Sequence, residues 1–168
     1  MQRRALRYGL LFLSALSAQP ALAAPATCVQ EKAAYNAASG GMVIAFQPVT
    51  EATAAISHRF TLTIGKTALD GIIMQTEEPV RSVARIMKDC PDGDVTGEDL
   101  RACTGFQGYV YAIAGDGKTG NLAGPGRMAA PRLLLAGLGP GLAYSPLAEK
   151  FGFGTALGDE FTFSECKS

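Results

Sequence analysis

The four cysteines of this chain carry its most definite chemistry: Cys28, Cys90, Cys103 and Cys166. Thiols ligate metals, exchange electrons or form disulfides. Metal sites and redox pairs use closely spaced cysteines such as Cys-x-x-Cys, and this chain has no such spacing and only one histidine. An even number of cysteines in an exported chain favours disulfides, and four cysteines allow three pairings. We favour Cys90 with Cys103, and Cys28 with Cys166.

Acidic residues gather between the cysteines of the predicted local disulfide. The candidate oxygen ligands are Asp92, Asp94, Thr96 and Glu98. With Gly97 at the sharp turn, the segment resembles the first half of an EF-hand calcium loop. The twelfth position, where that loop needs a bidentate glutamate, is Cys103. Two interpretations stay open: a weak calcium site, or an acidic helix-capping loop closed by a disulfide. No other cofactor is expected.

His58 is the only histidine, so a Ser–His–acid triad would have to use it. Ser57 precedes it directly, but the chain has no Gly-x-Ser-x-Gly elbow. The carboxylate pairs at 77–78, 92–94 and 159–160 could serve a glycosidase as acid and base. The chain lacks tryptophan, which often forms the sugar platform of such enzymes. An exported hydrolase using His58 or loop carboxylates is therefore the alternative function.

The segment 112–119, Ala-Ile-Ala-Gly-Asp-Gly-Lys-Thr, resembles a phosphate-binding P-loop. A working P-loop needs a helix that begins at its lysine, so that the first amides of the helix hold phosphate. Three glycines and a proline follow at 120–126 and prevent a long helix. We therefore predict a turn at 115–118 and no nucleotide site.

Residues 1–23 have the pattern of a cleaved signal peptide. Arginines at the start are followed by the apolar run 10–18 and by the small-residue site Ala21-Leu22-Ala23. The expected mature chain is a single domain, 24–168, in the periplasm or secreted. No integral membrane span is expected after cleavage, because glycines and prolines interrupt the most apolar remaining segment, 133–148.

Charge narrows the range of partners. Loss of the three arginines at 3, 4 and 7 reduces fifteen basic residues to twelve, against fifteen acidic ones, which gives a net charge of −3. A mildly acidic chain without a basic stripe argues against a nucleic-acid partner. We expect an unknown protein or small-molecule partner in the cell envelope.

Periodicity predicts an α+β fold with a four- to five-stranded, largely antiparallel sheet, two to four helices and two disulfides. The clearest strand is 59–64, where Phe60, Leu62 and Ile64 alternate with polar residues. The other predicted strands are 42–46, 72–75, 109–114 and 161–164, with a turn at Asp70-Gly71. Five segments are candidates for these two to four helices: 29–39, 80–88, 97–103, 133–138 and a short one after Ser145.

Two surfaces are candidates for binding. Arg81, Arg85 and Lys88 share one side of the predicted helix 80–88 and form either an anion-docking face or a plain solvated face. The Gly/Pro-rich segment Gly115–Gly141 is the best candidate for a contact surface, because long ordered loops often bind partners. The favoured function is a small exported binding or accessory domain without catalytic activity.

Overall fold

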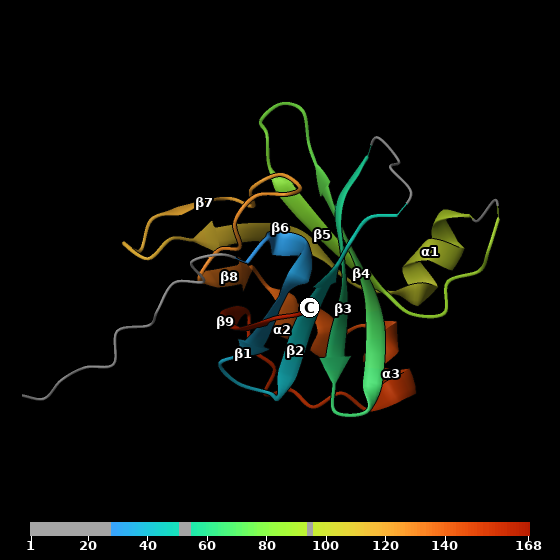
Figure 1. The fold of residues 1–168 in the computed structure, drawn as a ribbon. Coiled ribbons are helices and arrows are strands. Elements are labelled where there is room, and N and C mark those ends of the chain that lie inside the picture. Colours follow the sequence, from blue (N-terminus) through green and yellow to red (C-terminus); the bar gives the residue numbers. More distant parts are fainter. Residues whose placement is uncertain (1–27, 51–54, 94–95) are drawn as a thin grey trace, which may run out of the picture.

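A computed structural model of the chain describes residues 28–50, 55–93 and 96–168, and its strands form one antiparallel sheet (Figure 1). Eight strands close into a barrel, because β5 pairs with β4 on one side and with β6 on the other. The strands are β1 (Ala33–Ala37), β2 (Met42–Gln47), β3 (Ile56–Ile64), β4 (Thr67–Gln75), β5 (Ser82–Met87), β6 (Thr104–Ile113), β7 (Thr119–Asn121), β8 (Arg132–Leu135) and β9 (Glu160–Cys166). Within the described ranges, β7 lies outside the barrel and pairs only with β6. The predicted signal peptide, 1–23, lies outside these ranges.

This barrel overturns the α+β prediction, which was wrong in its strand number and in its balance of strand and helix. The largest error is the segment 80–88. Its apolar residues fit a helical period, but the buried side chains of β5 are Ser82, Ala84 and Ile86, at every second position. A short apolar run fits both periods, and the pairing of β5 with β4 and β6 decides for strand.

Three other element predictions were also wrong. The segment 29–39 forms the 3-10 turn η1 (Gln30–Lys32) and β1 in place of a helix. Asp70-Gly71 lies inside β4, and the chain turns at Gly65-Lys66. The first half of the segment 133–138 belongs to β8, a turn follows, and α2 (Leu138–Ala143) begins only at its last residue.

Local signals were more reliable at two helices. α1 (Gly97–Cys103) begins at Thr96, whose hydroxyl accepts from the Asp99 amide in a reciprocal capping box. α3 (Pro146–Phe151) begins at Ser145, which accepts from the Ala148 amide, and ends at the left-handed Gly152. The predicted strands 42–46 and 59–64 lie within β2 and β3.

Inward side chains from alternate positions fill the barrel. The register places Ile44, Leu62 and Leu69 in one row across β2, β3 and β4, and each is at most 1% exposed. Burial of one such side chain stabilises the fold by about 1.5–3 kcal/mol. The next row has Phe60 opposite Gly71, where a Cβ would lie 2.2 Å from the Phe60 ring.

Different elements cover the two ends of the barrel (Figure 1). At one end η1 precedes β1, and the Cys28–Cys166 disulfide joins the segment just before η1 to the last residue of β9. At the other end α2 and α3 pack on β6, with Leu138, Leu142 and Leu147 buried. The carboxylate of Asp159 accepts from the backbone amides of Gly137 and Gly139, and these bonds fix the start of α2.

Two disulfides are present, Cys28–Cys166 and Cys90–Cys103, with Cα atoms 5.7 and 5.2 Å apart. They join the pairs that the sequence favours. Disulfides are typical of proteins in oxidising, extracytoplasmic compartments.

None of the helices in the described ranges combines the length and the apolar character needed to cross a membrane.

Candidate functional site

The outer wall of β5 and β6, together with the loop residue just before β5, carries a cluster that we call the arginine–tyrosine face: Arg81, Arg85, Tyr109 and Tyr111. Ser82 and Val110 point into the barrel, so the residues beside them in sequence point outward. Val83 lies opposite Tyr109 in the register, and Arg85 lies opposite Gln107. Strand pairing thus brings side chains from two segments more than twenty residues apart onto one wall.

The two tyrosines form the aromatic part of this face. Their ring centroids are 6.4 Å apart, and Tyr109 is 50% exposed although it lies in a barrel strand. Tyr109, Val83 and Met74 lie opposite one another on β6, β5 and β4 and form an apolar row across this wall. Tyrosine, methionine and arginine are enriched at protein contact surfaces.

The two arginines supply its charge. The Arg85 guanidinium donates from Nε and Nη2 to Gln107 Oε1, at 3.1 and 2.9 Å, and Arg81 Nη1 donates to the Val80 carbonyl at 2.8 Å. Among the described residues neither guanidinium forms an ion pair with a carboxylate, although Glu77 and Glu78 precede Arg81 on the same loop. Both cations are therefore held in place by neutral acceptors.

Hydrogen bonds brace the loop that carries Arg81. Thr76 Oγ1 donates to the Pro79 carbonyl at 2.6 Å and accepts from the Arg81 amide at 3.0 Å. The Thr76 amide donates to the Arg81 carbonyl at 2.9 Å. From β7, Asn121 Nδ2 donates to the Val80 carbonyl at 3.0 Å. Thr76 thus holds the backbone of Arg81, and Asn121 ties the neighbouring Val80 to β7, which lowers the ordering entropy that binding there costs.

A hollow of about 270 Å³ lies where this loop meets β7. Its lining residues are Arg81, Tyr111, Thr119, Gly120 and Asn121. Part of the Gly/Pro-rich segment predicted as a contact surface therefore lines it. Of the predicted basic trio, Arg81 and Arg85 belong to the face, whereas Lys88 lies away from it, 3.3 Å from Asp89.

A second, larger cleft of about 490 Å³ lies at the opposite end, between the β3–β4 turn and the segment after α3. Phe151 and Phe153 line it with stacked rings, 6.0 Å between centroids. Its one charged lining residue is the exposed Lys66. The cleft therefore has an apolar wall but no converging set of polar groups.

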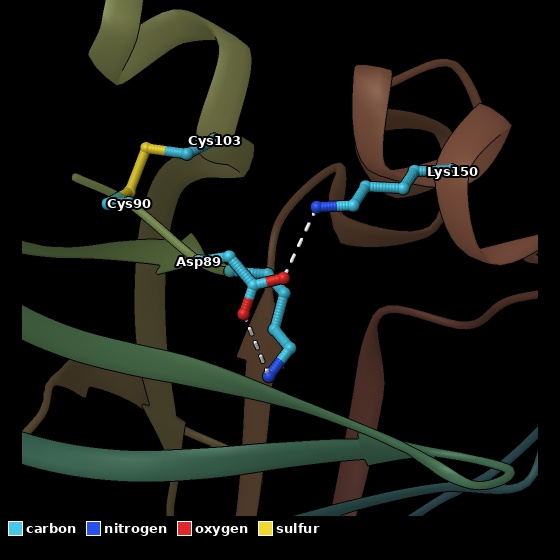
Figure 2. A network of polar contacts seen from close by, with 5 residues as sticks. Asp89, Cys90, Cys103 and Lys150 are labelled. Carbon is cyan, nitrogen blue, oxygen red and sulfur yellow. Dashed lines mark hydrogen bonds and ion pairs between the residues drawn. A yellow bond between two sulfur atoms is a disulfide. The ribbon is translucent and has the colours of Figure 1, made fainter.

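Asp89, the residue just before the Cys90–Cys103 loop, joins structural elements (Figure 2). Asp89 Oδ2 accepts from Lys150 Nζ of α3 at 3.2 Å, directly beside the disulfide that leads into α1. The bond from Lys150 is the main cause that lowers the pKa of the Asp89 carboxyl, with help from Lys88. These contacts connect the end of β5 with α1 and α3.

The structure describes three of the four candidate calcium ligands. Asp94 lies outside the described residues, and Asp92 and Glu98 are exposed. The Thr96 hydroxyl is used in the capping box with Asp99, and this hydrogen bond lowers the pKa of the Asp99 carboxyl. In the part of the chain that the structure describes, no three His, Cys, Asp or Glu residues are grouped to hold a metal ion. The calcium site stays a prediction.

His58 lies inside the barrel and is 0% exposed. Its Nδ1 is 3.1 Å from Ser57 Oγ, which donates to the Ile73 carbonyl, and its ring meets Phe46 edge-on at 6.0 Å. Burial lowers the pKa of His58, and the Glu31 carboxylate opposes this in part. A neutral imidazole without solvent access suits packing better than attack on a substrate.

Sequence reasoning missed the two tyrosines, because the apolar run 109–114 predicts a strand buried on both faces. Their exposure depends on which wall of the barrel stays uncovered, and the sequence carries no signal for it. Comparison of the chain with protein-family models, with curated protein sequences and with solved structures finds no match.

Proposed function

We propose that this chain is an exported, non-catalytic domain that binds a protein partner through the arginine–tyrosine face. The observation that carries the proposal is a half-exposed Tyr109 on the same wall as two arginines whose guanidinium groups, among the described residues, donate only to neutral acceptors. Tyrosine and arginine are enriched at the energetic centres of protein interfaces. A periplasmic or secreted location follows from the predicted signal peptide and agrees with two disulfides.

The alternative functions have less support. A hydrolase using His58 would need the barrel to open, because this side chain is 0% exposed. A hydrolase using the carboxylate at 159 would lose the two hydrogen bonds that Asp159 accepts from the start of α2. A calcium module would have to compete with the capping box for Thr96.

Site-specific photo-crosslinking in the native envelope tests the proposal. A photoreactive phenylalanine analogue at Tyr109 should give a defined covalent adduct with one other protein. The matched control is the same analogue at Thr61, an outward position on β3 that is partly exposed. Equal adduct formation at both positions, or none at Tyr109, contradicts the proposal.

A further inference from the structure

The outermost strand, β7, is the place where the closed barrel leaves backbone free to pair. Each of the eight barrel strands has a neighbour on both sides, whereas β7 pairs only with β6 in the described part of the chain. All three of its residues are exposed. An edge strand presents amides and carbonyls that an extended segment of another chain can pair with.

The hollow beside β7 lies at the small end of the range for small-molecule sites, a size that suits one or two side chains. Its volume of about 270 Å³ lies close to the lower limit of the roughly 300–1,000 Å³ of such sites. Thr119, Gly120 and Asn121 form one side of it, with Arg81 and Tyr111 completing the lining. A segment lying along β7 would place one or two of its side chains here.

The charged groups around the hollow determine which partner side chains it can accept. Lys118, in the turn before β7, is already paired with Asp116 at 2.7 Å, and the hydrogen bonds from Lys118 lower the pKa of the Asp116 carboxyl. Arg81 uses Nη1 on the Val80 carbonyl and has further N–H donors. Those donors match a carboxylate, and the Tyr111 ring beside them suits an apolar neighbour.

Taking the proposed function as given, we propose that the partner contributes an extended acidic segment that adds to β7 as a further strand. One carboxylate of the segment pairs with Arg81, and an apolar side chain next to it packs on Tyr111. The braced loop Thr76–Arg81 presents the guanidinium before the partner arrives.

Three fluorescein-labelled peptides test the inference on the mature, disulfide-bonded chain by fluorescence anisotropy at low salt. The probe is Val-Thr-Val-Glu-Val-Asp-Thr. The second peptide replaces both acids by their amides, and the third keeps the acids but replaces the first and third valines by proline, which disrupts strand pairing. We expect the probe to bind at least tenfold tighter than either control.

Two variants locate the site. Arg81→Gln should weaken probe binding about tenfold, whereas Lys66→Gln, in the β3–β4 turn at the opposite end of the barrel, should leave it unchanged. Equal binding of the proline peptide overturns strand addition, and equal loss in both variants overturns the role of Arg81. Absence of probe binding overturns this inference alone if Tyr109 still crosslinks. Absence of both signals overturns the proposed function as well.

Discussion

The carboxylate of Asp159 lies 2.7 Å from the backbone nitrogen of Gly139, where α2 begins. The other oxygen accepts from the Gly137 amide at 2.8 Å, so one side chain satisfies two donors at the start of a six-residue helix. So short a helix has little stability of its own and depends on such contacts.

Replacement of Asp159 should therefore loosen this end of the barrel. We expect Asp159→Ala to lower the free energy of unfolding by about 1–3 kcal/mol, because two amides lose a charged acceptor. Asp159→Asn should cost less, since its one carbonyl oxygen can keep one of the bonds. Urea unfolding measures both, with the exposed Asp70→Ala on β4 as control. An alanine variant as stable as the control would contradict this role.

The two disulfides should contribute unequally to the free energy of unfolding. Cys28–Cys166 closes a loop of 138 residues and Cys90–Cys103 one of 13, so chain entropy gives about 5 and about 3 kcal/mol. We expect the double serine variant at 28 and 166 to unfold at lower denaturant than the variant at 90 and 103. Equal midpoints in guanidinium titrations would show that loop length does not set their contributions.

Gly71 should be intolerant of a side chain. A Cβ there would lie 2.2 Å from the Phe60 ring, whose own position is fixed by the packed row across β2 and β3. We expect Gly71→Ala to destabilise the protein by at least about 1–3 kcal/mol through overpacking. At Gly115, in the β6–β7 connection, a Cβ would meet no atom within 4 Å, so Gly115→Ala should shift the melting temperature little. Equal melting temperatures of the two variants would contradict the close contact at Gly71.

The accuracy of the sequence predictions follows the range of the interactions involved. The caps Thr96 and Ser145 act within a few residues, so their helices could be predicted. In 59–64 apolar and polar residues alternate cleanly, and this pattern indicates a strand. The segment 82–87 is equally long, but its apolar residues stand at both odd and even positions. Only its pairing with β4 and β6 therefore distinguishes strand from helix.

The candidate site was harder to predict than the strands. Arg81, Tyr111 and Asn121 come together only because β7 folds back on β6 and the loop 76–81 bonds to it. No spacing in the sequence encodes that contact. The sequence pattern leaves the basic residues at 81, 85 and 88 as either an anion-docking face or a plain solvated face, in both cases on a helix, and it places the tyrosines in the core.

His58 should make the stability of the barrel depend on pH. Its ring is 0% exposed, and its Nε2 has no hydrogen-bond partner among the described residues. Burial is the main cause that lowers its pKa below the ordinary value of 6.5. The unfolded chain therefore takes up a proton at His58 at a higher pH than the folded chain does.

The direction of the pH dependence of stability follows from this difference in pKa between the folded and unfolded states. Well above pH 6.5 both states are neutral at this residue, and the folded state keeps its full stability. As the pH falls through 6.5, the unfolded state gains the proton first and stability is lost. The loss can reach about 1.4 kcal/mol per pH unit for one group, until the pH passes the lowered pKa of the folded state. The melting temperature should therefore fall between pH 7 and pH 5.

The variant His58→Phe removes the titrating group and keeps an aromatic ring against Phe46. Its melting temperature should stay nearly constant over the same two pH units. The lowered pKa values of Asp89, Asp99 and Asp116 act in a separate window, because those carboxylates lose their stabilising contribution only as the pH falls below about 3.8. If the wild type and the variant lose stability in parallel from pH 7 to pH 5, another group is responsible and His58 is not the pH-sensitive residue.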